Sequence, residues 1–303
     1  MVREQSAGIK NPLVRRIQGR YNRPMEKTVR APIVAGAFYP GNPAVLRMTV
    51  ESFFEGDGQW LDRTLASPVG LITPHAGYAY SGAVAAAGYG RVAALGRPEA
   101  VILLGANHTG LGAPFSISSD AIWETPLGRS PVDACLVAQL TDSGIPKTDA
   151  AFDREHSIEV QLPFIQSIWG CDLPIVPLCV MSVPLPSIRE SVEPIVQAIG
   201  SRSVLAVASS DFTHYEPDAT ARELDHLALV PIQALDSEGF ERVYRERRLS
   251  ICGAGAILTL LGLCRRLGLT TGKLVKYATS GDATGDRAAV VGYASVLFTT
   301  EES

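Results

Sequence analysis

Four of the five histidines in this 303-residue sequence lie in short turns rich in glycine, proline, serine or aspartate. These four are His75, His108, His156 and His214, and each stands at the end of an apolar run or at the start of a helical pattern. One such histidine would be explained by hydrogen bonding within its loop, but four at equivalent positions indicate a shared site. Imidazole binds zinc, iron, copper and nickel, and two histidines with one further ligand leave positions open for catalysis. The fifth histidine, His226, falls within a predicted helix, and we expect it to be structural.

Further side chains in these turns could complete a metal site. The third ligand could be Asp211, Glu155 or Cys252. Cys252 immediately precedes an Ala/Leu-rich helical pattern, and a helix N-terminus stabilises a thiolate. Two other interpretations stay open: Cys252 as a nucleophile with His156 or His214 as its base, and Cys252 as a plain buried thiol.

Three apolar runs predict the strands that would bring these turns together. They span residues 69–73, 101–104 and 204–208, and each ends within a few residues of a histidine. Because the carboxyl ends of parallel strands lie at one edge of a sheet, Asp211 and His214 should line the same cleft as His75. The alternation of such strands with helical patterns predicts an α/β fold, a central mixed sheet with helices on both faces.

Several other segments carry signals of their own. Asn42-Pro43 predicts the start of a helix, and Asp133 predicts a helix cap. We also expect these elements: a helix capped by Ser157, a helical stretch over 220–245 interrupted near Pro231, a turn over 123–128, a polar glycine loop over 281–286, and a strand over 289–298 that closes the sheet.

The composition argues against several classes of partner. The net charge is −4, without the basic face of a nucleic-acid binder, and no apolar run approaches the length of a membrane span. The N-terminus has no apolar segment typical of a secretory signal. The five cysteines are scattered without a C-x-x-C pair, which fits a reducing cytoplasm. We therefore expect a cytoplasmic protein with neither nucleic acid nor membrane as a partner.

The first 30 residues differ from the rest of the chain. They carry eight lysines and arginines with little apolar periodicity, which predicts a disordered basic leader. Residues 31–303 should form a single domain.

Six short blocks resemble the Memo family, whose bacterial and archaeal branch is known as AmmeMemoRadiSam system protein B. They come in that family's order and extend over the chain from about residue 31 to its end. The blocks are AGAFYP (35–40), PHAGY (74–78), GANH (105–108), EHSIE (155–159), SSDFTH (209–214) and ICG (251–253).

The resemblance implies a single α/β domain similar to class III extradiol dioxygenases, which use non-haem Fe(II). It also implies that His75, His108 and Cys252 stand where the family binds metal, with Asp211 and His214 nearby. Dioxygenases of that fold use two histidines and a carboxylate, so a cysteine at the third position is a departure. That thiolate extends the candidate metals from iron to copper and zinc.

The resulting hypothesis is a metal-binding, dioxygenase-like oxidoreductase that acts on a small-molecule or peptide ligand. His156 and His214 would serve as general acid/base groups, with Asp211 and Glu155 as orienting carboxylates. The resemblance adds the other components of the AmmeMemoRadiSam system, including its radical SAM protein, as possible partners. The alternatives are a non-catalytic module that binds a ligand, peptide or partner protein in a relic cleft, and a zinc-dependent hydrolase.

Overall fold

The three histidine-associated strands lie side by side in the sheet of the computed structural model, which describes residues 28–54 and 63–300. They are β2 (Val69–Thr73), β3 (Ala100–Ala106) and β8 (Val204–Ser209). The strand β8 pairs in parallel with both β2 and β3. All three strands are buried along their whole length, which accounts for their continuous apolar sequences. Their carboxyl ends therefore meet at one edge of the sheet.

The main sheet is mixed, as the sequence predicts. Among the described residues it has eight strands, ordered β10-β11-β2-β8-β3-β7-β4, with β9 paired to β11. The strand β7 extends the parallel centre, and β4, β9, β10 and β11 pair antiparallel at the two sides. Their bounds are Ile175–Val180 for β7, Phe115–Ile117 for β4, His214–Glu216 for β9, Thr271–Thr279 for β10 and Val290–Thr299 for β11. The strand predicted over 289–298 is confirmed as β11, but it lies inside the sheet with β10 at the edge, so it does not close the sheet as expected.

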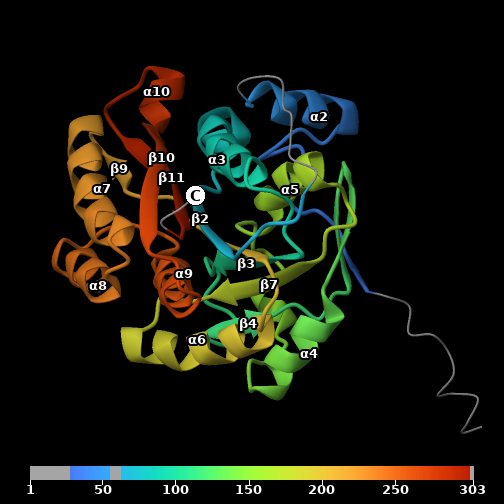
Figure 1. The fold of residues 1–303 in the computed structure, drawn as a ribbon. Coiled ribbons are helices and arrows are strands. Elements are labelled where there is room, and N and C mark those ends of the chain that lie inside the picture. Colours follow the sequence, from blue (N-terminus) through green and yellow to red (C-terminus); the bar gives the residue numbers. More distant parts are fainter. Residues whose placement is uncertain (1–27, 55–62, 301–303) are drawn as a thin grey trace, which may run out of the picture.

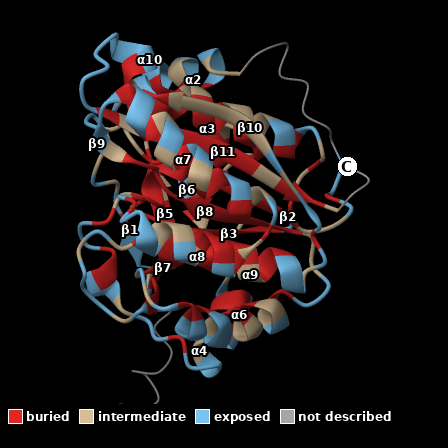
Figure 2. Cartoon of the chain, turned by 90° about the vertical axis from the view of Figure 1, so that its left-hand side faces the viewer, coloured by how far each residue is buried: buried red, intermediate tan, exposed pale blue. Residues whose placement is uncertain are grey.

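Helices cover both faces of this sheet (Figure 1). One face carries α2 (Pro43–Ser52), α3 (Tyr78–Ala93) and α5 (Leu162–Trp169). The other face carries α4 (Ala134–Asp142), α6 (Leu185–Ile199), α7 (Asp218–Gln233), α8 (Ser237–Glu246) and α9 (Ala254–Arg266). Figure 2 shows the buried residues concentrated in the sheet and the helix faces against it. The chain is a single-domain α/β protein.

Small residues let α3 pack closely on the sheet. A Cβ added at Gly88 would lie 2.7 Å from the Ser295 hydroxyl on β11, closer than packing allows. The helix α2 begins after the Asn42 cap and α4 after the Asp133 cap, as the sequence predicts. None of the helices in the described part of the chain is long and apolar enough to cross a membrane.

A small second sheet contains the first described strand. It joins β1 (Val29–Arg30), β5 (Ile122–Thr125) and β6 (Gly128–Pro131). The predicted turn over 123–128 is instead a hairpin whose strands β5 and β6 leave only Pro126-Leu127 as the connection. The predicted leader falls mostly on residues 1–27, outside the described residues, but Arg30 at its end is buried in this sheet.

Of two further predictions, one is confirmed and one is corrected. The helical stretch over 220–245 is interrupted near Pro231: α7 ends at Gln233, Leu235 has a φ of 56°, and Asp236 then caps α8. The segment 281–286 begins within a short helix, α10 (Ser280–Thr284), rather than forming a loop. A capping box between Thr279 and Asp282 starts that helix.

Candidate metal centre

Each of the three central strands delivers a polar side chain at the second residue beyond its end. His75 follows β2 in this way, His108 follows β3 and Asp211 follows β8. The backbone N–H of His75 donates to Asp211 Oδ1 at 2.8 Å, which joins two of these turns directly. The predicted convergence of His75 and Asp211 is therefore present in the fold.

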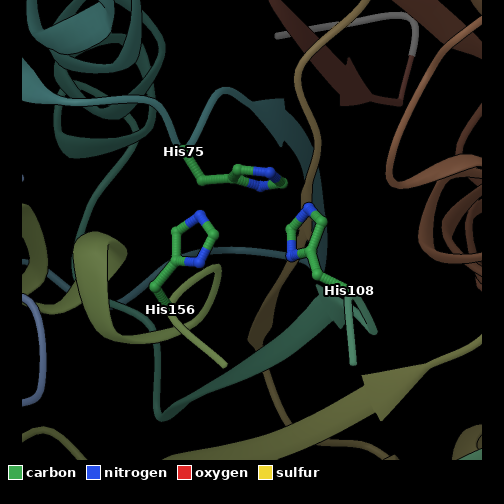
Figure 3. Close-up of side chains that lie close together, drawn as sticks. All are labelled: His75, His108 and His156. Atoms are coloured by element: carbon green, nitrogen blue, oxygen red, sulfur yellow. The ribbon is translucent and has the colours of Figure 1, made fainter. Parts of the chain in front are cut away.

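Three histidines gather at this edge of the sheet. Ligand atoms of His75, His108 and His156 all lie within 4.8 Å of one another. Figure 3 shows their rings facing a common space from three separate segments. The rings of His108 and His156 are stacked with centroids 4.9 Å apart, and His75 meets both edge-on. The side chain of His75 is 2% exposed, that of His156 20% and that of His108 34%, so the cluster opens to solvent on the His108 side.

Cys252 contacts this cluster through His75. Its Sγ lies 3.1 Å from His75 Nε2, while Asp211 Oδ2 lies 4.0 Å from the same nitrogen. Nitrogen and thiolate donors bound to one zinc ion at tetrahedral angles lie about 3.6 Å apart, so this pair fits a shared ion after a short movement. Cys252 can approach because Gly253 follows it: a Cβ there would lie 2.6 Å from the Ser209 carbonyl oxygen.

Glu155 organises two of the histidines. Its buried carboxylate accepts hydrogen bonds from the backbone N–H groups of His108, His156 and Ser157 at 2.8–2.9 Å. His108 Nδ1 lies 3.0 Å from both carboxylate oxygens, which leaves Nε2 of that ring free to face the cluster. Burial alone would raise the pKa of Glu155, but the hydrogen bonds and the charge of His108 hold it at about 2.

The protonation states differ within the cluster. Burial, reinforced by a neighbouring histidine, lowers the pKa of His75 to about 3 and that of His156 to about 4. Both rings are therefore neutral near pH 7, the form that binds metal. Burial alone would lower the pKa of His108, but its bond to Glu155 outweighs this and raises it.

The thiolate expected at Cys252 is not favoured in the metal-free protein. Burial and the nearby Asp211 carboxylate raise the pKa of Cys252, despite its place before α9. A cation bound at Sγ would favour the thiolate against these two effects.

The other candidate residues lie around the cluster. His214 starts β9, and its Nδ1 lies 2.8 Å from the Ser250 carbonyl oxygen. It is not a member of the three-histidine group. His226 is exposed on α7. Ser157 does not cap a helix as predicted: its hydroxyl donates to the Ala106 carbonyl, and a 3₁₀ turn (Glu159–Gln161) precedes α5.

The sequence patterns missed a second group of residues that support the cluster. The segment 30–39, which we name the N-terminal strap, is fixed by the buried carboxylate of Glu159. Arg30 pairs with Glu159 at 2.7 Å and also donates to the Glu155 carbonyl oxygen at 2.7 Å. Phe38 of the strap packs against His156 with ring centroids 4.5 Å apart. Arg30 stands at the end of a basic run, so the sequence did not distinguish it from the other basic residues of that run.

Comparison with known proteins decides the family. A family model described as "Memo-like protein" matches residues 30–297. The chain belongs to the Memo family. A MEMO1 family protein of Methanopyrus kandleri is 41% identical over 279 residues, which cover 89% of this chain and 98% of that protein. A MEMO1 family protein of Desulfurococcus amylolyticus is 43% identical over 280 residues, with coverage of 89% and 98%, and one of Thermotoga neapolitana is 40% identical over 281 residues, with coverage of 89% and 99%.

Among solved structures, an uncharacterised protein from Escherichia coli K12 superposes on this Memo-family chain with a TM-score of 0.48. It is 14% identical, and the match covers 76% of this chain and 99% of that one. A likeness at this level carries no argument about function.

Proposed function

We propose that this Memo-family protein binds Fe(II) through His75, His108 and Cys252. The observation that carries the proposal is the meeting of three imidazoles at one edge of the sheet, with the Cys252 thiol 3.1 Å from His75 Nε2. Nitrogen and thiolate donors suit iron, zinc and copper, and three protein ligands leave coordination positions open. Fe(II) comes first because the resemblance noted from the sequence leads to non-haem iron dioxygenases, with copper and zinc as alternatives.

The surrounding residues support an oxidoreductase acting on a small molecule. A bound Fe(II) would supply redox chemistry at its open positions. Glu155 would orient His108, and Asp211 would hold the backbone at His75. His156, with a pKa of about 4, is a neutral imidazole within the cluster that is not among the three proposed ligands, and it would accept a proton from a bound substrate. His214 would serve as a second acid/base group nearer the solvent.

One observation favours a second candidate function. The three side chains whose ligand atoms lie mutually close are all histidines, and a three-histidine set is a known catalytic zinc site. In that case His156 would be the third ligand in place of Cys252, and the chain would be a zinc-dependent hydrolase.

Anaerobic metal titration of the chelator-treated full chain tests both proposals. Fe(II), Zn(II) and Cu(II) would each be titrated into the wild type and into His75→Ala, Cys252→Ser, His156→Ala and Asp211→Ala. We expect His75→Ala and Cys252→Ser to lose at least ~10-fold in Fe(II) affinity, since even changes behind the ligands cost that much. The control is His226→Ala, because that imidazole is exposed on α7.

The pattern of losses identifies the third ligand. Loss in His156→Ala with none in Cys252→Ser, and a preference for Zn(II), would replace the first proposal with the second. Loss in Asp211→Ala with none in Cys252→Ser would make the third ligand a carboxylate. A wild-type chain that binds none of the three metals would contradict both proposals and favour a non-catalytic binding module.

A further inference from the structure

A chain of buried polar side chains lies behind His75, on the side away from Cys252. His75 Nδ1 lies 3.0 Å from the hydroxyl oxygen of Ser209, the last residue of β8. The Ser209 hydroxyl also lies 2.7 Å from the Ser157 carbonyl oxygen and 2.8 Å from Gln161 Nε2. Gln161 in turn meets the Pro74 carbonyl and the Tyr89 hydroxyl. These side chains are buried, so each of their polar atoms must find its partner within the protein.

The partners of Gln161 fix the orientation of its amide. One end of that amide lies 2.9 Å from the Pro74 carbonyl oxygen, which can only accept a hydrogen bond, so this end must be the NH₂ group. The same NH₂ group faces Ser209 and therefore donates to the Ser209 oxygen. The amide oxygen, at the other end, accepts from the Tyr89 hydroxyl at 3.1 Å.

The single proton of the Ser209 hydroxyl is then assigned as well. Two oxygens 2.7 Å apart must share a proton, and the Ser157 carbonyl has none, so Ser209 donates to Ser157. Ser209 has no second proton to give to His75. The contact between Ser209 and His75 Nδ1 must therefore be a hydrogen bond donated by the ring.

We propose that Ser209 is a positioning residue that keeps His75 in its Nδ1–H tautomer. The unprotonated Nε2 of that tautomer faces Cys252 Sγ at 3.1 Å, where an ion would bind. The opposite tautomer would place a proton on the nitrogen that must donate to the metal. The consequence for metal affinity rests on the function proposed above, whereas the tautomer itself does not.

The tautomer is measured directly on the full, chelator-treated chain labelled with ¹⁵N-histidine. Long-range ¹⁵N–¹H correlation spectra distinguish protonated from unprotonated ring nitrogens, and the signals of His75 are those missing from His75→Gln. We expect wild-type His75 to carry its proton on Nδ1 at neutral pH. A wild-type ring protonated on Nε2 would overturn the inference without the need for any serine variant.

Two serine variants then test the role of the hydroxyl. Ser209→Ala should shift His75 toward the Nε2–H tautomer and weaken metal binding by ~10- to 100-fold, whereas Ser209→Thr, which keeps the hydroxyl, should restore both. The matched control is Ser295→Ala on β11, a fully buried serine that donates to the Val84 carbonyl and does not contact His75. An unchanged tautomer in a folded Ser209→Ala chain would overturn the inference.

The metal measurement separates this inference from the proposed function. If wild-type His75 is protonated on Nδ1 but the chain binds no metal, the proposed function fails and the tautomer assignment stands. If the wild type binds metal and Ser209→Ala binds it equally well, Ser209 does not position the ligand.

Discussion

At the scale of single residues, Glu155 accepts more hydrogen bonds than a neutral side chain could. Three backbone N–H groups and the His108 ring converge on its two oxygens. These donors favour the ionised carboxylate over its protonated form, which is why the pKa of Glu155 falls to about 2 in spite of burial. The contribution of Glu155 to stability should therefore depend on pH.

We predict that the free energy of unfolding falls less between pH 4.5 and 2 in Glu155→Gln than in the wild type. Because the folded pKa of Glu155 lies below the ordinary value of 4.5, its contribution is present above pH 4.5 and is lost as pH falls toward 2. Urea unfolding of the metal-free wild type should thus show a decline over this window that is smaller in the variant. Glu51→Gln, an exposed carboxylate on α2, serves as the control and should follow the wild type. Parallel curves for all three proteins would contradict the prediction.

Part of the candidate site could be predicted from the types of residue and their positions in the sequence. His75, His108 and Asp211 could be predicted because each follows a continuous apolar run whose end fixes its place. Ser209 and Glu159 could not, because their roles depend on which atoms from distant segments meet them. Glu155 could be named as a candidate, but its partnership with His108 needs the fold.

At the scale of elements, the N-terminal strap depends on one buried carboxylate. Glu159 accepts hydrogen bonds from Arg30, from the backbone N–H groups of Ile33 and Val34, and from the Tyr39 hydroxyl. An amide in its place has one acceptor oxygen and would direct its NH₂ group at donors. The hydrogen bond from Arg30 of the strap to the Glu155 carbonyl oxygen would then be weakened.

We predict that Glu159→Gln lowers the free energy of unfolding by ~3–5 kcal/mol, the usual cost of breaking a buried ion pair by removing one partner. The matched control is Glu193→Gln, whose bridge to Arg266 has the same 2.7 Å separation but lies on the surface. That variant should lose less than ~1 kcal/mol. Equal losses in urea unfolding would mean that burial does not set the strength of the Arg30 pair.

The elements themselves were predicted best where the pattern was long or the cap was strong. The parallel strands and the helices capped by Asn42 and Asp133 appear where expected. The helix expected from Ser157 is present as α5 but begins only at Leu162, and the Ser157 hydroxyl donates to the Ala106 carbonyl instead of capping it. The break near Pro231 was predicted as well, because proline removes a backbone N–H from the helix, and α7 ends shortly after it at Gln233.

At the scale of the whole molecule, the described part of the domain begins at residue 28. Val29 and Arg30 pair with β5, and the family match begins at residue 30. Residues 1–24 carry little apolar periodicity, so their removal should cost no core contact.

We predict that a chain beginning at Met25 keeps the thermal midpoint of the full chain, whereas one beginning at Ala31 loses several degrees. The second chain lacks β1 and leaves the Glu159 carboxylate buried without Arg30. Differential scanning calorimetry of the three chains measures this. A large loss already at Met25 would mean that the first residues belong to the fold.

The dispersal of the site along the chain has a further consequence. His75 and Cys252 touch although 177 positions separate them, so a long chain must close before an ion can meet both. An unfolded chain therefore offers no comparable set of ligands. An ion that binds only the native form should raise the free energy of unfolding of the whole domain. At a free metal concentration 100 times the dissociation constant, mass action would add ~2.7 kcal/mol to the stability of the protein. Metal supply in the cell would then help to set how long each copy survives proteolysis, independently of any reaction at the site.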